Sequence, residues 1–136
     1  MRLWHKDLIQ YLPKNQLLGQ WRECCLIARS ISIKGTPNHI LVNKIMDYPI
    51  QHFIAYARLV QTEMLKRGYV PAWWSFIKWL ADKEYAVEPI NLFYKWHNNT
   101  YLRECFYNLE EKYMCGGISE DDWYKIDEAY RFASWR

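Results

Sequence analysis

Apolar residues recur every three or four positions along most of this chain, whereas the alternating pattern and the Val, Ile and Thr clusters of β-strands are scarce. Prolines and glycines divide the helical pattern into segments. Between Pro13 and about Ser30 the apolar residues form one helical face, which consists of Leu17, Leu18, Trp21, Cys24, Cys25 and Ala28. The pattern predicts an all-α protein in which Trp21 belongs to the core.

The other segments predict a bundle of about six helices in total. Proline is typical just before or at the start of a helix, and glycine is typical at its end. Ser119, which precedes three acidic residues, is the expected N-cap of the last helix. The expected segments are 5–12, 38–47 after a loop at 34–37, 49–68, an aromatic stretch at 73–79, 89–115, and a last helix after Ser119.

Length and composition bound the architecture. The chain has 136 residues, of which 51% are hydrophobic, and this is enough for one domain with its own core. No apolar run approaches the roughly 20 residues that span a bilayer, and the first residues lack the features of a signal peptide. We therefore expect a single domain over residues 1–136, a compact bundle that acts as a monomer in the cytoplasm.

The cysteines and histidines do not have the spacing of a metal site. Cys24 and Cys25 are neighbours, no C-x2-C pair exists, and the four histidines show neither H-x3-H nor H-E-x-x-H spacing. We expect buried, reduced thiols and neither a metal nor an organic cofactor.

Charge is distributed unevenly along the chain. Residues 1–70 contain ten Lys or Arg against four Asp or Glu, a balance of +6, whereas residues 71–136 contain eight against eleven, a balance of −3. The basic half suits an anionic partner, and phosphate backbones are the most common large one. The alternative is an ordinary solvated surface with uneven charge.

Two polar stripes run along the helix predicted at residues 13–30, one with Asn15, Arg22 and Arg29 and the other with Gln16, Gln20 and Glu23. Glu23 is one of the four acids in the basic half. A carboxylate among cations is stabilised as the anion, so that it could position an amine and accept a proton. The alternative is a surface ion pair worth about 0 to 1 kcal/mol.

The amino terminus is the other candidate reactive group. An α-amine loses its proton at a lower pH than a lysine and can form a Schiff base with a sugar carbon. Close to the terminus, Trp4 and His5 alternate with cations, a pattern that suits phosphate contact and stacking on bases. For Trp4 a place in the core is an equal alternative.

Residues 1–30 resemble the pyrimidine-dimer DNA glycosylases of the phage endonuclease V type, and especially their bacterial branch. The resemblance rests on MRLWH, on WRECC and on the spacing from the initiator to Arg22 and Glu23. Residues 64–69 also resemble the Leu-Lys-Arg-Gly-aromatic helix end of the family, and residues 123–125 resemble its aromatic and basic tail more weakly.

The resemblance implies a mechanism and site residues. In this family the amino-terminal α-amine attacks C1′ of the 5′ nucleotide of a dimer, the base leaves, and β-elimination from the imine nicks the strand. The essential carboxylate falls on Glu23, and Gln16 stands where the phage member has a DNA-contacting histidine. The family nucleophile is usually the second encoded residue, but the bulky Arg2 should prevent removal of methionine, so that the amine belongs to Met1.

We therefore predict a DNA repair glycosylase with abasic-site lyase activity and Met1 and Glu23 as catalytic residues. Its expected partner is double-stranded DNA with a damaged or modified base. The expected DNA contacts are Arg2, Trp4, His5, Gln16, Arg22, Arg29 and Lys34. The alternatives are a DNA-binding protein without the reaction and a helical module that binds other proteins.

Overall fold

The computed structural model describes residues 1–83 and 88–134, and it contains helices and no strands within these ranges. The elements in chain order are the 3₁₀ helix η1 (Lys6–Tyr11), α1 (Lys14–Lys34), the 3₁₀ helix η2 (Asn43–Asp47), α2 (Ile50–Lys66), α3 (Trp73–Ile77), the 3₁₀ helix η3 (Ala81–Lys83), α4 (Asn99–Met114) and α5 (Glu120–Ser134). The all-α prediction is confirmed.

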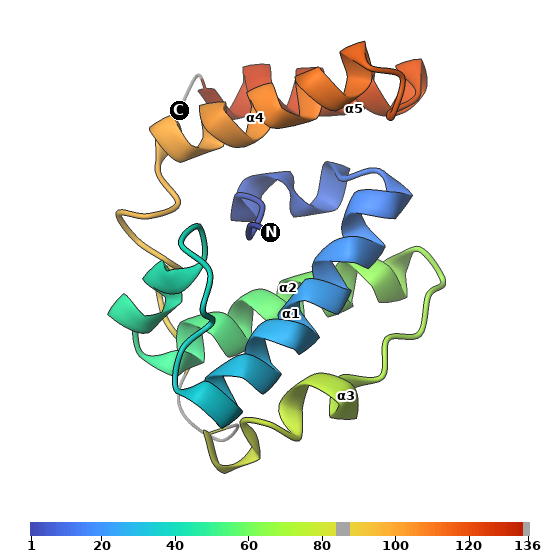
Figure 1. Cartoon of the computed structure of the whole chain (residues 1–136). Helices are drawn as coiled ribbons and strands as arrows, with labels where there is room; N and C mark the ends of the chain where they lie inside the picture. The colour runs from blue at the N-terminus through green and yellow to red at the C-terminus, as the bar shows by residue number, and fades with distance from the viewer. Residues whose placement is uncertain (84–87, 135–136) are drawn as a thin grey trace.

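The helices are arranged in layers around the first residues of the chain (Figure 1). Helix α1 packs on α2 and on the short α3, and α4 packs on α5. Between these two groups lies η1, which contacts both α2 and α5. As a result, the amino terminus appears in the middle of Figure 1, between the α4–α5 pair and the α1–α2 pair.

Helix α1 is longer than the sequence pattern predicts. It continues past Ser30 to Lys34, where Gly35 has a φ of 76° and donates its backbone N–H to the Ile31 carbonyl at 2.9 Å. A left-handed residue at this point is a common helix end that glycine adopts without steric cost. Lys34 therefore belongs to the last turn of α1, and the following loop begins one residue later than predicted.

Two predicted helices are shorter than expected. The prediction of a helix from about Pro89 to Cys115 is wrong at its start, because Phe93 and Lys95 have φ values of 50° and 71°, which a right-handed helix excludes. Helix α4 begins instead after Asn98, whose side chain accepts the backbone N–H of Tyr101 at 2.9 Å. Similarly, the helix expected at residues 38–47 is only the 3₁₀ turn Asn43–Asp47.

Other local predictions hold. Helix α2 follows Pro49 and ends at Lys66, and Gly68 has a φ of 88°. The Ser119 hydroxyl accepts the backbone N–H of Asp122 at 3.2 Å, which confirms this residue as the cap of α5.

The core is rich in aromatic side chains, and it includes Trp21 as predicted. Not every aromatic residue of the 73–79 stretch belongs to it: Phe76 is fully buried, but Trp74 is 67% exposed. All four cysteines are free thiols, as expected, although only Cys24 and Cys105 are buried and Cys115 is exposed.

The end of α2 holds η1 in place through one side chain. Arg67 donates hydrogen bonds to the carbonyl oxygens of Leu12 at 2.7 Å and Gln10 at 3.2 Å, and it pairs with Glu63 at 2.9 Å. These contacts hold the carboxyl end of η1 against the end of α2.

Candidate active site

The amino-terminal segment runs into the core. Met1 is 41% exposed and Arg2 is half-buried, whereas Leu3, Trp4 and His5 are buried. Trp4 and His5, expected to contact DNA, therefore place their side chains among the protein's own, and they retain only 7% and 2% of their surface exposed. The alternative that Trp4 belongs to the core is the one that the structure supports.

The side-chain amide of Gln20 on α1 holds this segment with both of its polar atoms. Its Oε1 accepts the backbone N–H of Trp4 at 2.7 Å and lies 3.0 Å from the Tyr56 hydroxyl oxygen, whose one proton is shared with the Trp4 carbonyl. Its Nε2 donates to the Arg2 carbonyl at 3.0 Å. Gln20 is only 1% exposed, so this residue of the predicted polar stripe is a buried residue and not a surface one.

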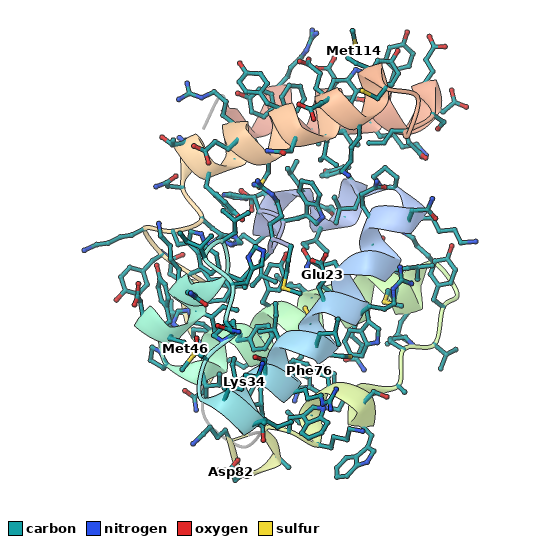
Figure 2. All side chains as sticks on the ribbon, in the orientation of Figure 1. Glu23, Lys34, Met46, Phe76, Asp82 and Met114 are labelled. Carbon is teal, nitrogen blue, oxygen red and sulfur yellow. The ribbon has the colours of Figure 1, made fainter. Side chains whose placement is uncertain are left out.

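Glu23 contacts the same side-chain amide of Gln20. Gln20 Nε2 also donates to Glu23 Oε2 at 3.4 Å, so one NH₂ group contacts both the carboxylate and the main chain of Arg2. Glu23 is half-buried, and its side chain lies between α1 and the amino-terminal segment (Figure 2). The amide thus brings the predicted carboxylate within a short distance of the first residues of the chain.

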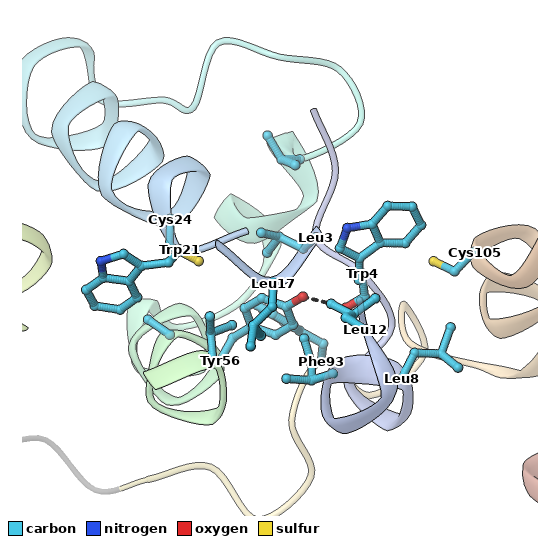
Figure 3. Close-up of a cluster of buried hydrophobic side chains, with 14 of the residues drawn as sticks. Leu3, Trp4, Leu8, Leu12, Leu17, Trp21, Cys24, Tyr56, Phe93 and Cys105 are labelled. Carbon is cyan, nitrogen blue, oxygen red and sulfur yellow. Dashed lines mark hydrogen bonds between the residues drawn. The ribbon is translucent and has the colours of Figure 1, made fainter. Parts of the chain in front are cut away.

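Two tyrosine hydroxyls bind the segment from other elements. Tyr56 of α2 donates to the Trp4 carbonyl, and Tyr101 of α4 donates to the Leu3 carbonyl, both at 2.5 Å. Figure 3 shows Leu3 and Trp4 among the buried side chains, with the Tyr56 hydrogen bond dashed. Burial raises the pKa of both tyrosines well above the usual value, so both hydroxyls remain protonated donors at neutral pH.

A buried histidine completes the set of contacts. His97 Nδ1 accepts the backbone N–H of Lys6 at 3.0 Å, and the ring stacks on His5 with 5.1 Å between centroids. Burial, with smaller effects from His5 and Lys6, lowers the pKa of His97 to about 2. The imidazole is therefore neutral at physiological pH, which leaves Nδ1 free to accept the hydrogen bond.

The side chain of Arg2 lies against α4. Its Nη1 is 3.9 Å from Cys105 Sγ, and its guanidinium lies 5.7 Å from the centroid of the Trp4 ring. This predicted DNA contact therefore packs partly against the protein itself, with the half-buried side chain helping to hold the segment.

The other predicted contacts lie along α1. Arg22, Arg29 and Lys34 are exposed. Arg22 folds back over Gly19, since a Cβ there would lie 3.9 Å from its Nη2, and so it covers part of the surface that the glycine leaves open. Gln16 is half-buried, and its Oε1 is buried without a hydrogen-bond partner among the residues that the structure describes.

Sequence reasoning did not identify Tyr56, His97 or Tyr101 as site residues. They contact the segment from 52, 91 and 98 positions away in the sequence. No local pattern marks them, whereas Gln20 was visible in the polar stripe with Glu23.

Within the described ranges, no group of three or more His, Cys, Asp or Glu side chains could hold a metal ion. In the same ranges, no helix combines the length and the apolar character that a membrane span requires.

Fold and site together define a class: helical proteins that hold their own amino-terminal segment near a carboxylate, on a helix that also carries exposed cations. A family model described as pyrimidine dimer DNA glycosylase matches residues 1–72, more than half of the 136 residues. The chain belongs to this pyrimidine dimer DNA glycosylase family, whose role is in DNA repair and whose substrate is DNA with pyrimidine dimers. The matched residues comprise η1, α1, η2 and α2, and thus include Gln20, Glu23 and Tyr56.

No curated protein and no solved structure matches the chain significantly.

Proposed function

We propose that this protein is a DNA glycosylase and abasic-site lyase in which the α-amine of Met1 is the nucleophile and Glu23 is its acid–base partner. The observation that carries the proposal is the hydrogen bonding of Gln20 Nε2, which contacts both Glu23 Oε2 at 3.4 Å and the Arg2 carbonyl at 3.0 Å. The amine is one residue from a main-chain group that this amide holds.

The proposed reaction begins with the uncharged amine. Its nitrogen forms a bond to C1′ of the damaged nucleotide as the bond from C1′ to the base breaks, and the base leaves with the bonding electron pair and takes up a proton. The sugar ring then opens: the bond from C1′ to O4′ breaks, O4′ takes up a proton, and the amine nitrogen becomes part of a protonated imine.

Strand cleavage follows from the imine. A proton leaves C2′, the electrons shift toward the imine, and the 3′ phosphate departs from C3′. Water then hydrolyses the imine and returns the free amine of Met1. These steps use an amine, a carboxylate and water, and they need neither a metal nor an organic cofactor.

Glu23 is suited to the proton transfers that these steps require. As a carboxylate it can take the proton that the attacking amine loses and deliver it to O4′ when the ring opens. The exposed cations of α1, namely Arg22, Arg29 and Lys34, are the proposed phosphate contacts. The proposed substrate is double-stranded DNA that contains a damaged base such as a pyrimidine dimer.

The test is borohydride trapping on DNA that contains an abasic site, preceded by an intact-mass measurement of the protein to establish which residue is first. Reduction should yield a stable protein–DNA adduct that peptide mapping assigns to the α-amine of Met1. The matched control is the same protein with its α-amine blocked, which should give no adduct. If the unblocked protein forms no adduct, the proposal is wrong, and DNA affinity without trapping would favour a binding protein that lacks the reaction.

A further inference from the structure

Side chains from separate parts of the chain hold the main chain of residues 2–6. Gln20 donates to the Arg2 carbonyl and accepts the Trp4 N–H. Tyr101 donates to the Leu3 carbonyl, and Tyr56 donates to the Trp4 carbonyl. His97 accepts the Lys6 N–H. We call these four side chains the anchor. Free chain ends usually fray, whereas side chains bind five main-chain groups of this one.

Half of the anchor comes from outside the family-matched residues. Gln20 and Tyr56 lie within residues 1–72, but His97 and Tyr101 do not. His97 precedes the Asn98 cap of α4, and Tyr101 lies in the first turn of that helix. The part of the chain that the family match does not cover therefore contributes directly to the geometry of the candidate site.

From this arrangement, we infer that Tyr101 and Gln20 are positioning residues that hold the Met1 amine beside Glu23 for attack on C1′. This inference rests on the proposed function. The physical reason is that a displacement of about 1 Å in a reacting group can reduce the rate roughly a hundredfold. Met1 itself is partly exposed, so its amine depends on the anchored Arg2 and Leu3 for its location.

Tyr101 can be tested by removing a single atom. Its hydroxyl is the hydrogen-bond donor to Leu3, and the ring separately packs on His97 with 5.0 Å between centroids. Tyr101→Phe keeps the ring and removes the donor, so that the Leu3 carbonyl loses its partner while the surrounding packing is kept. The matched control is Tyr107→Phe, because Tyr107 lies on the same helix with a side chain that is 55% exposed.

The measurement is single-turnover borohydride trapping on abasic-site DNA, with protein in excess and varied in concentration. We expect Tyr101→Phe to lower the trapping rate constant at saturation by roughly tenfold to a hundredfold, while the protein concentration at half-saturation stays within about twofold of wild type. Tyr107→Phe should match wild type in both. A merely structural role would differ: because the protein is in excess, partial unfolding raises the total protein concentration at half-saturation and leaves the rate constant at saturation unchanged.

Gln20→Glu provides a second and independent test. A carboxylate oxygen can still accept from Trp4 and Tyr56, but the NH₂ group that reaches Arg2 and Glu23 is gone. The matched control is Gln10→Glu, which adds the same charge at an exposed position of η1. We expect the rate constant to fall at least tenfold for Gln20→Glu and to change less than twofold for Gln10→Glu.

The outcomes separate this inference from the proposed function. If wild type traps and both Tyr101→Phe and Gln20→Glu trap at the wild-type rate, the positioning role is wrong and the proposed function stands. A rise in the half-saturation concentration alone in both variants, with the rate constant at saturation unchanged, also overturns the positioning role. If Tyr101→Phe does not fold, Gln20→Glu decides, and if neither folds, the anchor is structural and the inference fails. Absence of trapping by wild type would remove the proposed function and this inference together.

Discussion

The guanidinium of Arg67 donates a hydrogen bond of 2.7 Å to the carbonyl oxygen of Leu12, the residue that caps the end of η1. Through this contact, the last residue of the Leu-Lys-Arg sequence at the end of α2 supports the element that follows the amino-terminal segment. The motif therefore has a structural explanation in this protein that does not involve DNA.

Arg67→Ala should destabilise the fold. The variant leaves the Leu12 and Gln10 carbonyls and the Glu63 carboxylate without a charged donor, and hydrogen bonds to charged groups contribute about 1.5 to 3 kcal/mol each. Because these effects are not additive, we expect the free energy of unfolding to fall by about 1 to 3 kcal/mol in urea titrations. Lys66→Ala, at the exposed neighbouring position, is the control and should stay within about 0.5 kcal/mol of wild type.

Glu23→Gln should separate chemistry from binding. The variant retains an oxygen that can accept from Gln20 but cannot accept the proton of the amine, so we expect the trapping rate to fall about 10²-fold to 10⁴-fold. The affinity for abasic-site DNA, measured by fluorescence anisotropy, should be equal to that of wild type or slightly higher, since a negative charge is lost.

The control for this variant is Glu110→Gln, an exposed carboxylate on α4. It removes the same charge away from the candidate site and should leave the trapping rate unchanged. Wild-type rates for Glu23→Gln would return Glu23 to the role of a surface carboxylate.

The exposed cations of α1 should control the salt dependence of DNA binding. Each phosphate contact that is lost reduces the slope of log K against log salt concentration by about 0.9. We expect Arg22→Ala and Lys34→Ala each to produce a change of this size and to weaken binding to all sequences alike. Lys112→Ala, at an exposed position of the acidic half, is the control. An unchanged slope in both α1 variants would mean that DNA binds elsewhere.

Buried histidines should make the fold sensitive to acid. In the folded protein the pKa of His97 is about 2, compared with 6.5 for the unperturbed group. Below pH 6.5 the unfolded chain therefore binds a proton that the folded chain does not, and stability falls as the pH decreases. Burial also lowers the pKa values of His5 and His52, which contribute in the same direction.

We expect the stability contributed by His97 to be complete above pH 6.5 and to fall by about 1.4 kcal/mol per pH unit once the pH is well below that value. The measurement is urea unfolding between pH 7.5 and 5. His97→Gln keeps an acceptor for the Lys6 N–H without a titrating group, so its stability should change less steeply with pH. An equally steep change in this variant would assign the acid sensitivity to other groups.

Features that depend on neighbours in the sequence could be predicted without the structure. Pro49 and Gly68 mark the limits of α2, Ser119 caps α5, and the three-and-four spacing placed Trp21 in the core. Glu23 stood out as an acid in a basic half. These features are local because caps, helix ends and helix faces depend on residues within a few turns of one another.

The helix predictions that failed depend on distant contacts. The segment before α4 has helical spacing, but Phe93 is fully buried and its N–H donates to His52 Nδ1 at 2.9 Å, so the tertiary contact and not the local pattern decides its backbone. Distant contacts also decide the surroundings of Trp4 and His5. Their alternation with cations suggests DNA contact, but the folded chain buries both side chains.

The sequence by itself determined the helical class of this protein, its membership of a repair family and the presence of a carboxylate at position 23. Only the tertiary structure decided where the amino terminus goes, because Tyr56 and Tyr101 reach it from 52 and 98 positions away. These hydrogen bonds form because buried carbonyl groups of the amino-terminal segment need donors in the absence of water, and separate helices supply them. That requirement, and not any local pattern, brings the first residues of the chain beside Glu23.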